Sequence, residues 1–139
     1  MDIDRILVDL STISHLKDQD KLGILNLPGK QQIVIHSGRS WFQGLYRYWD
    51  NASRNDVTTY LHYLVGQVEK QSELFSEPVT EKTRVSRANL KDAIEAAIEG
   101  LHHLMNTYAS DSHVVATITL ATAKLKECRR QIKTQPPAT

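Results

Sequence analysis

The sequence has little of several residue types, and each shortage excludes a class of protein. Cys128 is the only cysteine among 139 residues, so no disulfide can form within the chain, which favours a reducing compartment, the cytoplasm or nucleus. No run of about 18 apolar residues occurs, and the acidic start Met1-Asp2-Ile3-Asp4 differs from the basic and then apolar start of a signal peptide. We therefore expect an intracellular protein that does not enter a membrane.

The sequence also carries almost no excess of one charge. Its 17 Lys and Arg residues balance 16 Asp and Glu residues, which gives a formal net charge of +1. A strongly basic nucleic-acid binder needs a clear positive excess, so the balance argues against one while local patches stay open. With 40% apolar residues the composition is that of one globular domain. The spacing of the apolar residues, described below, makes that domain helical over residues 1–133, and a disordered tail is expected at 134–139.

Motifs of catalysis and cofactor binding are absent too. The chain contains neither Gly-x-Ser-x-Gly nor Gly-x-Gly-x-x-Gly, and no two of its histidines have the i, i+4 spacing that places both imidazoles on one helix face. We therefore predict no enzyme, no cofactor and no metal site, and a pairing of His62 with Glu69 is a catalytic alternative without a motif. Cys128 lies between Leu125 and Ile132 on an apolar stripe, which predicts a buried and inert thiol.

The first part of the chain predicts one helix and a marginal pair of strands. Apolar residues recur at helical spacing over residues 3–16, and Asp2 or Asp4 suits the N-terminal end of that helix. Residues 32–36 are short and β-branched, as in a strand. The only candidate partner for that strand is Leu22–Leu27, so a short β-hairpin near residues 22–36 is the alternative to a loop.

The rest of the chain predicts four further helices. Ser40 can cap a short helix over 41–50, and Ser53 begins a longer one that Pro78 ends. An exposed connector follows at 77–85. Ser86 begins two long amphipathic segments joined by a short turn, which predicts an antiparallel helical hairpin over 86–133. The fold class is therefore all-α, a small bundle of about five helices.

Aromatic residues are concentrated in one short element, where they alternate with arginines. Three readings stay open: the rings form core, they form a surface for a protein partner, or with Arg39 they bind single-stranded nucleic acid. The residues predicted to bind a protein partner are Trp41, Phe42, Arg47, Tyr48, Trp49 and Arg54.

The end of the last predicted helix carries a basic face. Positive charge at a helix C-terminus complements the helix dipole, which is the simpler explanation, and an anionic partner is the alternative. Only Glu127 opposes the cations in this stretch of sequence. The residues of the basic face are Lys124, Lys126, Arg129, Arg130 and Lys133.

Two stretches carry a resemblance to a known group of proteins. They are Trp41-Phe-x-Gly-Leu-x-Arg-Tyr-Trp, followed by Ser53-Arg54 at a helix start, and Gly100-Leu101 with Thr107-Tyr108 before the last helix. This pattern resembles small uncharacterised helical proteins of large eukaryotic DNA viruses. The resemblance implies a small, soluble viral protein without known chemistry, and it assigns no catalytic residue.

The leading functional hypothesis is a non-enzymatic protein that binds another protein or a second copy of itself. The long hairpin is expected to leave one apolar face uncovered, and charged substitutions at Leu101 and Ile118 are expected to break a dimer or unfold the chain. The alternative is weak nucleic-acid binding by Arg39, Arg47 and Arg54 together with the basic face, with an affinity that falls as salt rises.

Overall fold

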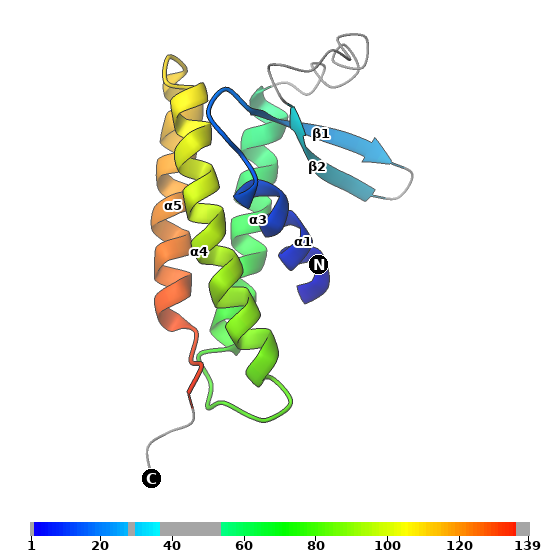
Figure 1. The fold of residues 1–139 in the computed structure, drawn as a ribbon, viewed down its shortest axis with the longest axis vertical. Coiled ribbons are helices and arrows are strands. Elements are labelled where there is room, and N and C mark those ends of the chain that lie inside the picture. Colours follow the sequence, from blue (N-terminus) through cyan, green and yellow to red (C-terminus); the bar gives the residue numbers. More distant parts are fainter. Residues whose placement is uncertain (1, 28–29, 37–53, 136–139) are drawn as a thin grey trace.

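The computed structural model describes residues 2–27, 30–36 and 54–135, and it is largely helical (Figure 1). The elements in chain order are α1 (Ile3–Ser14), β1 (Lys21–Leu27), β2 (Lys30–His36), α3 (Arg54–Leu74), α4 (Arg84–Thr107) and α5 (Ser112–Gln131). The prediction of a helical fold that ends in a helical hairpin is confirmed. The short helix predicted over 41–50 lies outside the described residues, as does most of the tail predicted at 134–139.

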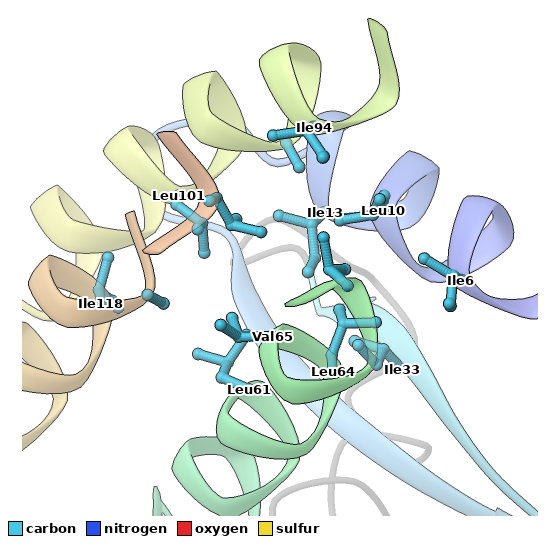
Figure 2. Packing of buried hydrophobic residues seen from close by; sticks show 14 of the residues in the cluster. Ile6, Leu10, Ile13, Ile33, Leu61, Leu64, Val65, Ile94, Leu101 and Ile118 are labelled. Atoms are coloured by element: carbon cyan, nitrogen blue, oxygen red, sulfur yellow. The ribbon is translucent and has the colours of Figure 1, made fainter. Parts of the chain in front are cut away.

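The four described helices surround one apolar core. α5 packs against both α3 and α4, and α1 packs against α4 and, less extensively, against α3. Figure 2 shows side chains from α1, α3, α4 and α5 pointing toward one another. Leu101 is 1% exposed and Ile118 is 0% exposed, so both belong to this core. Of the two outcomes predicted for charged substitutions at these positions, their burial favours unfolding of the chain, because the other helices cover that side of the α4–α5 hairpin.

Side-chain caps explain where two helices begin. Asp2 accepts a hydrogen bond of 2.9 Å from the Arg5 backbone N–H at the start of α1, as its sequence position predicted. Asp111 caps α5 by accepting bonds from the backbone N–H groups of His113 and Val114. Each carboxylate satisfies N–H groups that the first helical turn leaves without a partner.

Two predicted helix boundaries differ from the structure. α4 begins at Arg84, before the predicted Ser86, and Thr83 caps it without a side-chain hydrogen bond. α3 ends at Leu74, so Pro78 is not the residue that stops it. The Ser76 hydroxyl donates a bond of 2.6 Å to the Glu73 carbonyl, and such a local bond competes with the next helical turn.

The β-hairpin predicted as an alternative is present. β1 and β2 pair antiparallel from Lys21↔His36 to Leu27↔Lys30. Leu22 and Ile33 are 5% and 2% exposed and belong to the same core as the helices. A two-stranded sheet is marginal by itself, and burial against the bundle supplies the apolar contact it needs.

Gly100 allows α1 and α4 to touch through their backbones. A Cβ atom at this position would lie 1.8 Å from the carbonyl oxygen of Ile13. No side chain fits in that space, so glycine is required for α1 to dock at this distance. The sequence alone gave no sign that a glycine in the middle of α4 has this role.

Arg87 holds the connector between α3 and α4 and the end of α5 together. It is 2% exposed, its guanidinium carbon lies 5.1 Å from the centroid of the Phe75 ring, and its Nε donates a bond of 2.8 Å to the Thr83 hydroxyl. Backbone carbonyls rather than carboxylates accept its remaining bonds, so the connector predicted as exposed is also fixed. The acceptors are the carbonyls of Phe75, Glu77, Pro78 and Lys133.

Candidate interaction surface

The predicted aromatic and arginine element lies almost wholly outside the described residues. Trp41, Phe42, Arg47, Tyr48 and Trp49 belong to the segment 37–53, as does Arg39. Arg54 is the first residue of α3, and its side chain is not described. The hypothesis that this element binds a partner therefore stays a prediction.

The basic face of α5 is largely paired with carboxylates from three helices. Lys124 lies 3.8 Å from Glu69 of α3, and Arg129 lies 3.9 Å from Glu95 of α4. Arg130 binds Glu127 one turn away through two contacts, at 3.0 and 2.5 Å. Glu127 is the acidic residue within this stretch of sequence, and the packing of the helices adds Glu69 and Glu95, which are distant in sequence.

These ion pairs are exposed, so they change the surface more than they change stability. An exposed pair contributes about 0–1 kcal/mol, but it leaves less free positive charge for a phosphate backbone. Lys126 and Lys133 are exposed side chains on the same part of the molecule. The main chain of Lys133 has a structural role, since its N–H donates to the Phe75 carbonyl. The pairing counts against the nucleic-acid alternative.

An open groove of about 440 Å³ lies between α3 and α5. Three carboxylates and one ammonium group face it, and Cys128 contributes to its wall. The thiol is 2% exposed, and burial raises the pKa of Cys128, with a smaller opposing effect from the Ser72 hydroxyl. The thiolate is therefore disfavoured. The lining residues are Glu69, Glu73, Ser76, Lys124, Glu127, Cys128 and Gln131.

A buried carboxylate connects α1 to α3. Asp9 is 0% exposed and accepts a short hydrogen bond from the Tyr60 hydroxyl, while its second oxygen lies 3.6 Å from Nε of Arg5. Burial raises the pKa of Asp9, and the Tyr60 and Arg5 contacts lower it by less. Burial and the neighbouring carboxylate raise the pKa of Tyr60 to about 12. Both groups are thus shifted toward their neutral forms, as in a structural contact.

The catalytic pair considered from the sequence does not form. His62 and Glu69 lie on α3 about two turns apart, which separates them by roughly 10 Å along the helix axis. Glu69 instead contacts Lys124. In the described part of the chain, no three His, Cys, Asp or Glu side chains come together in a way that could hold a metal ion.

The outer face of the first three turns of α5 is uncharged and uncovered by the described helices and strands. Residues 112–123 include no Asp, Glu, Lys or Arg. Leu120 is 46% exposed, and the exposed Ala116 and Ala123 flank it on the same side of the helix. The Thr119 hydroxyl donates a bond of 2.8 Å to the Val115 carbonyl, so it is engaged within its own helix and this face is less polar than its sequence suggests.

Five exposed residues of α5 form a single line, which we call the α5 stripe. Their spacing alternates between three and four residues, the repeat that keeps side chains on one helix face. Sequence periodicity missed this stripe because the stronger apolar pattern of α5 belongs to its buried face. The α5 stripe consists of His113, Ala116, Leu120, Ala123 and Glu127.

Other exposed large apolar side chains are spread over the remaining helices. Val8 lies on α1, Tyr63 and Leu74 on α3, and Val85 on α4, with exposed fractions from 50% to 68%. Single exposed apolar residues are normal on a protein surface. The α5 stripe differs because its leucine lies between small residues on a face that carries no charge over three turns.

Comparisons with known protein families, curated proteins and solved structures found no match to this chain. The resemblance to small helical proteins of DNA viruses therefore stays a prediction. None of the described helices combines the length and the apolar content needed to cross a bilayer.

Proposed function

We propose that the protein is a non-enzymatic helical scaffold that acts by binding protein, with a second copy of itself as the first partner to test. The observation that carries this proposal is the uncharged, half-exposed face of α5 around Leu120. The outer faces of α3 and α4 carry exposed charges, including Glu73 and Glu99. Charged residues are depleted at the centre of protein interfaces, so α5 offers the better contact surface.

The state of the ionisable groups also favours binding over catalysis. A nucleophile or general base needs an accessible group with its pKa shifted toward the working pH. The Cys128 thiol is buried and its pKa is raised, and Asp9 is buried against Tyr60. These groups support the packing of α5 on α3 and of α1 on α3, respectively.

Sedimentation velocity on the full chain tests the proposal. The weight-average mass is expected to start near the monomer value of 15.8 kDa and to rise toward twice that value as the concentration increases. Fluorescence quenching of Trp41 and Trp49, measured in the same samples, reports whether the aromatic element takes part. A mass that stays at the monomer value at every concentration would remove self-association as the function.

A further inference from the structure

The α5 stripe has an arrangement of charge that suits a second copy of the same helix. Leu120 lies seven residues after His113 and seven residues before Glu127. A two-fold axis through Leu120 that sets two α5 helices antiparallel brings each leucine opposite the other. The same axis places His113 opposite the partner's Glu127, and Ala116 close to the partner's Ala123.

We propose that two copies of the chain associate through the α5 stripe, antiparallel and with Leu120 at the two-fold axis. This inference rests on the proposed function and names the surface and the geometry that it uses. A two-fold contact joins the same patch of both subunits, so the patch must be complementary to itself. The α5 stripe meets that condition in the antiparallel orientation.

A parallel pairing of the same stripe lacks this complementarity. It would place each Glu127 beside the partner's Glu127 and each Arg130 beside the partner's Arg130. Like charges placed opposite each other disfavour an interface and thereby select its orientation. The antiparallel arrangement instead sets the cationic end of α5 over the uncharged first three turns of its partner.

The groove between α3 and α5 adds to the complementarity at each end of the contact. Glu127 belongs to the α5 stripe and also lines the groove, and Glu73 of α3 lines the groove with it. Both glutamates are exposed, and Glu127 also accepts two hydrogen bonds from Arg130 of its own helix. The imidazole of the partner's His113 therefore approaches a pair of carboxylates, which accept hydrogen bonds from an imidazole and attract its charged form.

The small residues beside Leu120 set the strength of the contact. Ala116 and Ala123 have side chains of a single methyl group, so the two helices can approach closely over these positions. Only one large apolar side chain per copy becomes buried. We therefore expect a weak dimer that forms at high protein concentration, since a small interface offsets little of the entropy lost on association.

Leu120→Glu is the first test, with Leu74→Glu as its matched control. Leu74 is 64% exposed at the end of α3 and lies outside the α5 stripe, so both variants replace an exposed leucine of a helix by glutamate. Sedimentation equilibrium on the full chain is expected to show a dimer dissociation constant at least tenfold higher for Leu120→Glu than for the wild type. The constant for Leu74→Glu is expected to equal that of the wild type. Circular dichroism checks that both variants stay folded.

A charge exchange tests the pairing of the stripe. Glu127→Lys is expected to weaken the dimer, because lysine then faces the partner's His113. The variant also removes the contact between Glu127 and Arg130 within α5, so the double variant carries the test of the pairing. Adding His113→Glu to that variant restores opposite charges across the axis and is expected to recover most of the lost affinity.

Thiol cross-linking tests the orientation of the helices. Leu120→Cys is expected to cross-link to itself with a short bifunctional thiol reagent, since the two positions meet at the axis. Ala116→Cys is expected to cross-link efficiently only when mixed with Ala123→Cys. Efficient cross-linking of Ala116→Cys to itself would indicate a parallel contact and overturn the inference.

The outcomes separate the inference from the proposed function. If the wild type dimerises and Leu120→Glu dimerises equally well, the α5 stripe is not the interface, while protein binding by the chain stands. If the wild type is monomeric at every concentration, both the inference and self-association fail.

Discussion

Replacing Asp9 by asparagine is expected to raise the free energy of unfolding above that of the wild type at neutral pH and to leave it nearly unchanged at acid pH. The Asp9 carboxylate is 0% exposed, and one of its oxygens has no hydrogen-bond partner, although Arg5 lies 3.6 Å from it. Asparagine keeps an acceptor for the Tyr60 hydroxyl and removes the buried negative charge. The substitution therefore separates the cost of the charge from the value of the hydrogen bond.

The sign of the pH dependence follows from the direction of the pKa shift. Burial raises the native pKa of Asp9 above the ordinary value of 3.8, so the native state binds this proton more tightly than the unfolded chain does. The resulting stability is fully present below the unfolded pKa and is lost as the pH rises through the native pKa. Asparagine does not titrate, so the free energy of unfolding of the variant minus that of the wild type grows with pH over this window.

The expected size follows from the contacts of the carboxylate. A buried polar group without its full set of hydrogen bonds costs about 1–3 kcal/mol. The Tyr60 bond and the nearby Arg5 offset part of that cost for the charged form. We therefore expect Asp9→Asn to gain about 1 kcal/mol over the wild type at pH 7 and close to nothing at pH 3.

Urea unfolding followed by circular dichroism between pH 3 and pH 8 measures this difference. Asp18→Asn serves as a control of opposite sign, because a hydrogen bond from His103 lowers the pKa of the exposed Asp18 carboxyl. The Asp18 carboxylate stabilises the native state above the pKa of the unfolded chain. The free energy of unfolding of Asp18→Asn minus that of the wild type is therefore expected to fall as the pH rises. An Asp9→Asn difference that is flat or falls with pH would refute the account of a costly buried charge.

Two further substitutions test the packing of the bundle by urea unfolding. Gly100→Ala is expected to lower the free energy of unfolding by about 3 kcal/mol, because the new methyl group meets the Ile13 carbonyl. Gly66→Ala is the control and is expected to raise it by about 0.5–1 kcal/mol, because no atom lies within 4 Å of its Cβ position. Equal effects would contradict the contact between α1 and α4. Arg87→Met is expected to cost about 3 kcal/mol or more, since it removes one donor from each of four carbonyls, of which the Phe75 carbonyl keeps the Lys133 N–H. A loss below about 1 kcal/mol would show that water replaces the guanidinium.

The main helices could be predicted from sequence because their buried faces recur at helical spacing. The stripe from Leu90 to Leu104 appears as the buried side of α4, and Asp2 caps α1 as its position indicates. The sequence predicts the β-hairpin only as an alternative to a loop. Its strands satisfy each other's backbone groups, but its stability depends on the burial of Leu22 and Ile33 against the helices, which no local pattern reveals.

The candidate site was less predictable than the fold. The basic residues of α5 form an unopposed patch in the sequence, and only the packing of α3 and α4 beside them brings Glu69 and Glu95 into contact with Lys124 and Arg129. The α5 stripe was hidden as well, because alanine and threonine give a weak apolar signal. Whether the α5 stripe can serve as a contact surface depends on which side of α5 the other helices leave uncovered.

The amino-acid order by itself determined the helical class, the hairpin of α4 and α5 and the burial of Cys128, since each follows from periodicity within one segment. The tertiary structure alone decided that Gly100 touches Ile13, that Arg87 binds four carbonyls and that Leu120 stays at the surface. These features join segments far apart in the chain. Local spacing specifies which face of a helix is apolar. Which neighbour covers that face is decided only when all the helices pack together and bury their apolar surface.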